Sequence, residues 1–303
     1  MESKTVKLSN SQCKELDEVI TSLVEKYKTE YIFCFGCLND TKTANSCFVE
    51  EVKQSNTHYF LLMITTDAAR IEHDVQDYVN TSFETTKITI VAHGIETVTN
   101  AILQGCRFFS AVCRYGLQLY SASGLRLNID YPNLNPATTF NKAQKHFYHR
   151  FGMASGFLES ASNSYDSGFY SNCMFELHQS VEQACIAVIR VYMAYCADLH
   201  NLSRLISLCR CFSSEPADSF RRKTDEDQRL FQLLLKSYSE TRYKDDYKIV
   251  DHDADMLCTQ VREFLELIKK LCNKKLQEYR QAAEDAGKDI EDNFPLLPAS
   301  LFS

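Results

Sequence analysis

The spacing of apolar residues changes along the chain and divides it into two halves. Before about residue 125, short apolar runs alternate with segments of helical spacing, which is typical of an α/β domain. After about residue 140, apolar residues recur at helical spacing, which indicates a bundle of four or five antiparallel helices. We therefore predict an α/β plus all-α fold, with a mixed-sheet domain over 1–125, a linker over 126–140, a helical bundle over 141–285 and a tail over 286–303.

The first half begins with a helix, because Ser9–Gln12 fits a capping box and apolar residues follow at helical spacing up to Tyr27. The apolar run Tyr31–Phe35 predicts a strand that ends in a turn at Gly36. The polar stretch Leu38–Thr57 is expected to be a loop. The remaining elements expected are strands at Tyr59–Thr65 and Lys87–Ala92, helices at Ile71–Val79, Ile95–Leu103 and Cys106–Tyr115, and a closing segment at Leu117–Tyr120.

In the second half, several stripes of apolar residues each predict a helix that faces a common core. One stripe runs from Met174 to Tyr192, a shorter helix starts near His200, and a long last helix runs from Met256 to Leu276. Between them, a further helix carries Phe231, Leu235, Tyr238 and Arg242 on one face. The prolines all fall outside these segments, as expected of a residue that disrupts helices.

Composition places the chain among globular proteins, since 45% of its residues are hydrophobic and 24% are charged. No run is long and apolar enough for a membrane span, and Met1–Asn10 lacks the apolar core of a secretory signal. We therefore expect a soluble cytoplasmic protein. The 13 cysteines are expected to act as small core residues, and Cys34 and Cys37 have no second pair that would complete a zinc site.

A net charge of −7 argues against non-specific binding of nucleic acid, which depends on Lys and Arg neutralising phosphates. Local basic patches remain possible at Arg221–Lys223 or at Lys269, Lys270, Lys274 and Lys275. Solvated surface charge is the favoured interpretation of both.

The second half resembles a HEPN domain, a helical module often paired with small nucleotidyltransferases. The resemblance rests on three segments, Tyr165–Ala184, His200–Leu205 and Tyr238–Tyr247, in their order and spacing. It covers roughly 141–285. HEPN modules commonly pair through their helices, so the resemblance implies a homodimer.

The first half resembles a nucleotidyltransferase domain. That family has a strand ending in a Gly-Ser turn, then a strand with two carboxylates one residue apart, then a third strand with another carboxylate. Here Cys37 follows Gly36 at the turn, and His58 and Phe60, or close neighbours, take the carboxylate positions. The third strand, Ile88–Ala92, has no acidic residue.

Loss of these acids bears directly on catalysis, because carboxylates hold the divalent cations that nucleotidyl transfer requires. The nearest acids, Glu50, Glu51 and Asp67, are expected in a loop or beyond the strand. A magnesium cofactor is therefore expected only if the chain is an active nucleotidyltransferase. Gly36 and Cys37 stay ligand-binding candidates, since a glycine turn can hold a phosphate through its backbone N–H groups.

The ribonuclease members of the HEPN family resemble one another in an Arg followed four to six residues later by His. From Arg190 to His200 and from Arg242 to His252 the spacing is too long. Ribonuclease activity is therefore not favoured, although an RNase effector of a toxin–antitoxin or antiviral system remains an alternative.

A polar set within the helical half gives the other candidate ligand residues. His178 and Glu182 lie one turn apart on the core-facing side of their helix, and an unpaired buried charge is costly. We expect Glu182 or Asp246 to pair with Arg242, with His178 and Tyr243 nearby. An ion pair that fixes helix register is the favoured interpretation; the alternative is a nucleotide pocket where Arg242 and His200 meet phosphate.

Two pairs of histidines are weaker candidates for a functional site. His58 and His93 flank strands and are expected to be surface or edge groups. His146 and His149 lie three apart on a helix, a spacing that suits a metal pair, but no third ligand is evident.

Together these observations predict a non-catalytic protein that binds a nucleotide or a nucleic acid. An RNase effector and an active nucleotidyltransferase remain as alternatives from other classes.

Overall fold

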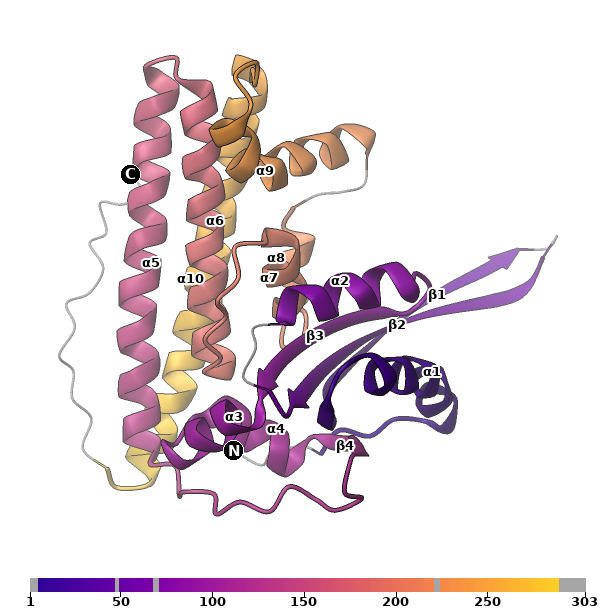
Figure 1. Ribbon diagram of the computed structural model, residues 1–303. Helices are drawn as coiled ribbons and strands as arrows, with labels where there is room; N and C mark the ends of the chain where they lie inside the picture. Colours follow the sequence, from indigo (N-terminus) through magenta and orange to yellow (C-terminus); the bar gives the residue numbers. More distant parts are fainter. Residues whose placement is uncertain (1–4, 47–48, 68–70, 221–223, 289–303) are drawn as a thin grey trace. The chain divides into compact units, whose positions relative to one another are not determined.

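The computed structural model describes residues 5–46, 49–67, 71–220 and 224–288, and within 40–56 only the backbone (Figure 1). Contacts divide the chain into two compact units, Met1–Asn133 and Leu134–Ser303. The first contains a mixed sheet and the second is helical, as the α/β plus all-α prediction requires.

The first unit is built on a four-stranded sheet in the order β3-β2-β1-β4. Strands β1 (Thr29–Ser46) and β2 (Val49–Thr65) are antiparallel, and β4 (Leu117–Ser121) pairs antiparallel with the other edge of β1. Strand β3 (Lys87–Gly94) runs parallel to β2. A parallel neighbour requires a crossover, which α2 (Glu72–Ser82) provides.

Helices cover both faces of this sheet. Helix α1 (Asn10–Lys26) and α2 contribute Leu16, Val19, Leu23, Val75 and Val79 to a core with alternate residues of β1, β2 and β3. On the opposite face lie α3 (Ile95–Leu103) and α4 (Arg107–Tyr115), where Phe108 of α4 meets Phe35 of β1 edge to face at 5.4 Å. Side chains alternate between faces along a strand, so β1 and β2 serve both cores.

The stretch Leu38–Thr57, predicted to be a loop, instead lengthens both β1 and β2 into a hairpin that projects beyond the rest of the sheet (Figure 1). Its backbone pairs continue from Leu38 opposite His58 to Ser46 opposite Val49. A hairpin satisfies its backbone hydrogen bonds locally, so the strands extend without an apolar face to signal them. The prediction that Glu50 and Glu51 lie in a loop was therefore wrong.

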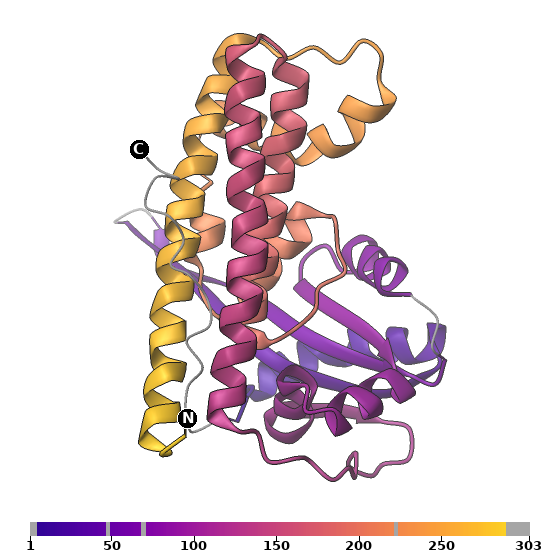
Figure 2. The ribbon, with the colours of Figure 1, turned by 90° about the vertical axis from the view of Figure 1, so that its left-hand side faces the viewer.

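The second unit is a bundle of long helices with two shorter ones against it. Helix α6 is buried along most of its length and packs against α5, α9, α10 and α7. Helices α5, α6 and α10 each pack against the other two, and Figure 2 shows the three running side by side. The helices are α5 (Pro136–Asp166), α6 (Tyr170–Met193), α7 (Leu202–Cys209), α8 (Glu215–Asp218), α9 (Asp225–Tyr243) and α10 (Asp251–Asp285).

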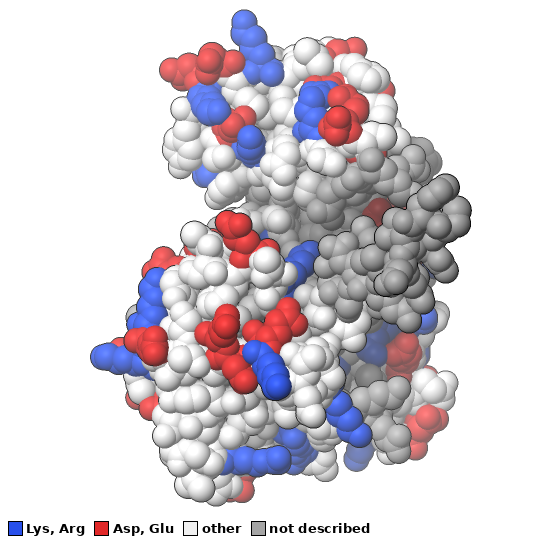
Figure 3. Space-filling view, turned by 90° about the vertical axis from the view of Figure 1, so that its right-hand side faces the viewer, with Lys and Arg blue, Asp and Glu red and all other residues white. Residues whose placement is uncertain are grey.

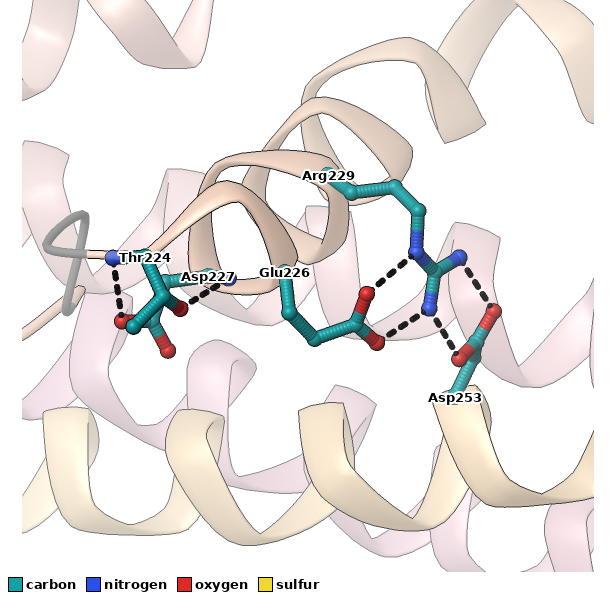
Figure 4. Close-up of polar contacts among 5 residues, drawn as sticks. All are labelled: Thr224, Glu226, Asp227, Arg229 and Asp253. Atoms are coloured by element: carbon teal, nitrogen blue, oxygen red, sulfur yellow. Dashed lines mark hydrogen bonds and ion pairs between the residues drawn. The ribbon is translucent and has the colours of Figure 1, made fainter.

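Polar caps set where several of these helices start. The Asn135 side chain accepts a hydrogen bond from the Ala137 N–H, and Pro136 occupies the first helical position, where its missing donor costs nothing. Helix α5 thus begins inside the segment 126–140 that the sequence predicts as a linker. Before α9, Thr224 and Asp227 form a reciprocal capping box (Figure 4).

Cysteines of the described residues are free thiols, and several are core residues as expected. Cys173 and Cys258 are buried between α6 and α10, with their sulfur atoms 3.5 Å apart. Burial raises the pKa of Cys34 to about 12, which suits a packing role. Within the described ranges, no helix is both long and apolar enough to cross a bilayer.

Candidate functional site

A buried carboxylate lies near the middle of α6. The side chain of Glu182 is 3% exposed, and its Oε1 atom is 3.2 Å from Nδ1 of His200, whose side chain is 65% exposed. Burial raises the pKa of Glu182, while the hydrogen bond from His200 and the charges of His200 and Arg150 partly offset this. The pair therefore connects a buried acid to an imidazole that solvent reaches.

Tyr238 of α9 lies beside this pair and joins the rest of the site. The His200 and Tyr238 rings are nearly parallel at a centroid distance of 5.9 Å, and the His178 ring stacks on Tyr238 at 5.2 Å. The guanidinium of Arg242 lies over the Tyr238 ring, 3.8 Å from its centroid, which is a cation–π contact. We call His178, Glu182, His200, Tyr238 and Arg242 the Tyr238 cluster.

The two histidines of the cluster differ in solvent access. His178 is 1% exposed, and burial, with the nearby positive charges of His200 and Arg242, lowers its pKa to about 4. It is therefore neutral at physiological pH. The cations that a ligand reaches are His200, when protonated, and Arg242, both exposed.

Arg242 does not form the predicted ion pair. In the part of the chain that the structure describes, it has no carboxylate partner; its Nε donates to the carbonyl of Tyr238, one turn earlier. Asp246 lies beyond the end of α9 and is exposed. Tyr243 is 76% exposed, with the Arg242 guanidinium 5.0 Å from its ring centroid. Glu182 pairs with His200 instead, because α6 presents it to the segment before α7.

A second charged network links α9 to α10 and was not predicted. Arg229 bonds both carboxylate oxygens of Glu226 and both of Asp253 (Figure 4). Asp253 is 4% exposed, and the hydrogen bonds from Arg229 lower its pKa. Arg229 also lines an open depression of about 500 Å³ with Ser203, Asp225, Gln228, Phe231, Gln232 and Leu235. With two carboxylates already on the guanidinium, this network holds helices together.

In the first unit, Gly36 does not form the predicted turn. It lies inside β1, paired with Phe60, after a shift of register that follows Cys34. Its backbone is part of the ladder, so no turn presents N–H groups to a phosphate. Cys37 faces the α1 side, where the Gln12 amide donates to its sulfur at 3.3 Å, and burial raises its pKa.

The positions expected for metal-binding carboxylates are filled by buried side chains, none of which is a carboxylate. His58 is 3% exposed, so the surface position predicted for it was wrong, and its Nε2 lies 2.8 Å from the Thr89 hydroxyl of β3. Phe60 is fully buried and packs on the His58 ring at 4.2 Å. No group of three or more His, Cys, Asp or Glu side chains suited to a metal occurs among the described residues.

Comparison with known proteins concerns mainly the helical unit. The family model of the HEPN domain matches residues 148–271, from within α5 to within α10. The helical unit matches the HEPN family. No curated protein matches the chain. One similar solved structure is a nucleotidyltransferase-like protein from Exiguobacterium sibiricum, with 11% identity, 89% of this chain and 80% of that chain covered, and a TM-score of 0.24.

All five residues of the Tyr238 cluster lie within the HEPN match. The sequence pointed to His178, Glu182, His200 and Arg242 but missed the part that Tyr238 plays. One signal was available: Tyr238 and Arg242 are four residues apart on one helix, which places a cation over an aromatic ring. The partner of Glu182 could not be predicted, because His200 lies outside any helix and its position depends on the segment before α7.

Proposed function

We propose that the chain is a non-catalytic protein that binds a nucleotide or a nucleic acid at the Tyr238 cluster of its HEPN region. One observation carries the proposal: an aromatic ring, an exposed guanidinium and an exposed imidazole converge above a buried carboxylate. Nucleobases stack on aromatic rings and arginine planes, and phosphates bind to guanidinium groups.

The charges of the cluster support an anionic ligand. Arg242 is exposed and has no carboxylate partner in the part of the chain described, so its charge is available to a phosphate. The buried Glu182 carboxylate accepts a hydrogen bond from His200 and so orients the imidazole, and burial raises the pKa of Glu182. A buried acid with a hydrogen-bonded imidazole also offers an acceptor to the edge of a base.

Two features favour binding without catalysis. In the first unit, the expected metal-binding positions hold His58 and Phe60, with Thr89 beside them, and none of these is a carboxylate. In the HEPN region, the sequence lacks the short Arg-to-His spacing of the ribonuclease members.

Binding is tested by thermal shift and calorimetry of the intact protein against a series of nucleotides and a single-stranded oligonucleotide. At saturation the melting temperature of the wild type should rise by several degrees, because ligands that bind the native state stabilise it. Arg242→Ala should abolish the shift with an unchanged melting temperature of the free protein, while Arg262→Ala on α10 should behave as the wild type. Unfolding of Arg242→Ala without any ligand effect would mean that the contact with Tyr238 is only structural.

A ribonuclease is the second candidate, and the hydrogen bond between Glu182 and His200 favours it. A carboxylate that orients an imidazole produces a general base, which can take the proton of an RNA 2′-hydroxyl. Incubation of labelled RNA with the protein, with and without divalent metal, tests this. Cleavage by the wild type that disappears in His200→Gln or Arg242→Ala would overturn the non-catalytic proposal.

The homodimer expected from the resemblance to HEPN modules remains a proposal. Sedimentation of the intact protein measures it directly, with a mass near twice 34.8 kDa as the expected result.

A further inference from the structure

One face of α5 is basic along its first half and lies next to the Tyr238 cluster. From Pro136 to Leu158 the helix contains no Asp or Glu, although the protein as a whole is acidic. Over the same stretch it carries Lys142, Lys145, His146, His149 and Arg150. At 100° per residue these five fall within less than half of the helix circumference, opposite the buried residues Phe147, Phe151 and Ala154. We call them the basic face of α5.

Helix α6 adds a second arginine to this face. The Nη1 atom of Arg190 is 3.0 Å from Nδ1 of His146, and Arg190 also contacts the sulfur of the exposed Cys196. One turn further along α5, the Nη1 atom of Arg150 donates to the Gln183 side chain at 2.7 Å. Among the described residues neither arginine has a carboxylate within ion-pair distance, and the Nε atom of each is buried without a hydrogen-bond partner.

Elsewhere on the protein, charges of opposite sign lie side by side. Figure 3 shows acidic and basic groups interspersed on the face it presents. On α10, the exposed Lys270 lies one turn after Glu266, and the exposed Lys274 lies one turn before Glu278. The basic face of α5 differs because, among the described residues, none of its side chains has a carboxylate within ion-pair distance. Burial and the neighbouring cations Arg190, Arg150, Lys145 and His149 together lower the pKa of His146, consistent with a positive potential there.

We propose that the basic face of α5, together with Arg190, binds a row of phosphate groups such as the backbone of a nucleic-acid strand presents. From Lys142 to Arg150 the face is about 12 Å long at the usual helical rise, which is more than a single phosphate occupies. Lysines and arginines without acidic partners are the groups that neutralise phosphates and displace their counterions.

Contacts connect this face to the Tyr238 cluster. Arg150 bonds to Gln183, whose amide lies 3.4 Å from the Glu182 carboxylate, and Glu182 bonds to His200 beside Tyr238. These contacts run through the buried side chains of Gln183 and Glu182, and in this inference a strand whose base stacks on Tyr238 lays its next phosphates along α5. In this form the inference rests on the proposed function and narrows its ligand to a strand with several phosphates.

The test uses a fluorescent single-stranded oligonucleotide titrated into the intact protein at several salt concentrations. The variant is Lys142→Gln with Lys145→Gln, two exposed side chains whose change leaves the core intact. We expect affinity to fall several-fold and the slope of log K against log salt to shrink by about 1.4, because each phosphate that a lysine neutralises on a single strand contributes about 0.7 to that slope. The control, Lys270→Gln with Lys274→Gln on α10, removes the same charge from exposed positions and should match the wild type.

The outcomes separate this inference from the proposed function. If the wild type binds, Arg242→Ala loses binding, and the α5 variant keeps both the affinity and the salt slope of the wild type, the basic face binds no phosphate and only the inference fails. If mononucleotides bind as tightly as the oligonucleotide, the ligand is not a strand and the inference also fails. If the wild type binds neither, the proposed function fails as well.

Discussion

At the scale of single residues, Tyr238 decides how the site is arranged. Among the described residues, Phe175 and His178 of α6, His200 of the connecting segment and Arg242 of α9 pack on its ring, and no carboxylate is among them. Charge complementarity in the sequence suggested an ion pair between Arg242 and Glu182 or Asp246. The structure differs because Arg242 lies near the end of α9 in solvent, where a ring face contacts it more readily than a buried carboxylate does.

His178 should make stability depend on pH. Its pKa is lowered to about 4 in the folded protein against an ordinary value of 6.5, so between these values the unfolded chain binds more protons. The contribution that neutral His178 makes to the free energy of unfolding is therefore fully present above pH 6.5. It is lost as the pH falls from 6.5 to 4. The His178 contribution to this loss should reach about 2 kcal/mol at pH 5.

Urea unfolding at pH 7 and pH 5 measures this, with His178→Gln as the variant. The difference in unfolding free energy between the two pH values should be smaller in the variant than in the wild type. His93 in the first unit also has its pKa lowered to about 4 by burial, so part of the loss will persist. The exposed His252→Gln serves as the control, and equal pH dependence of all three proteins would contradict the account.

At the scale of elements, the spacing of apolar residues predicted most helices but did not predict the lengths of β1 and β2. Helices α1–α4, α6, α7, α9 and α10 occur where apolar spacing predicts them, although α10 begins before and ends after the predicted Met256–Leu276. Helices α5 and α8 were not predicted individually. The hairpin was missed because its polar strands carry no apolar period. The prediction of a turn at Gly36 was also wrong. Glycine is common at turns, but inside a strand it can mark a bulge, and the register of β1 shifts between Cys34 and Gly36.

The link between α9 and α10 depends on Arg229. Replacing it by Ala leaves Asp253 buried with an unpaired charge, so we expect a loss of about 2 kcal/mol in the free energy of unfolding. Glu226→Gln removes only the exposed partner and should cost a few tenths of a kcal/mol. Both are measured by urea unfolding at pH 7. A loss in Arg229→Ala no larger than in Glu226→Gln would show that Asp253 does not need its partner.

Two glycines give opposite expectations for the same substitution. A Cβ added to Gly156, in the middle of α5, would meet nothing within 4 Å, so Gly156→Ala should stabilise the helix by about 0.5–1 kcal/mol. A Cβ at Gly116 would lie 2.4 Å from the carbonyl oxygen of Val112, so Gly116→Ala should destabilise the first unit. Thermal unfolding distinguishes them, and a lower melting temperature for Gly156→Ala would mean that something outside the described contacts requires the glycine.

At the scale of the whole molecule, the two compact units each have their own core. The core side chains of the bundle come from α5 to α10, all within Leu134–Ser303. Residues 134–288 expressed alone should therefore fold, with a strongly helical circular dichroism spectrum and a cooperative thermal transition. An aggregated product or a melt without a transition would show that the bundle depends on the first unit.

The division into a mixed sheet and a helical bundle was predicted from the sequence, and so was the HEPN resemblance of the second unit. The site was predicted only in part, since His178, Glu182, His200 and Arg242 were named but their contacts were not. Periodicity reports which face of a helix is buried, whereas contacts such as that of His200 with Glu182 depend on how an irregular segment returns to the bundle. In the sequence, the basic face of α5 is part of a stretch without acidic residues. The net charge of −7 for the whole chain does not reveal this stretch.

Binding of a nucleotide or a nucleic acid at the Tyr238 cluster is the central claim, and photo-crosslinking tests it most directly. A single-stranded oligonucleotide with a photoreactive base is irradiated with the intact protein, and the modified peptides are identified by mass spectrometry. The account predicts adducts at Tyr238 or in the adjacent segment around His200, and their disappearance in Arg242→Ala. Adducts confined to the first unit, or no adduct at any position under conditions where the oligonucleotide binds, would contradict it.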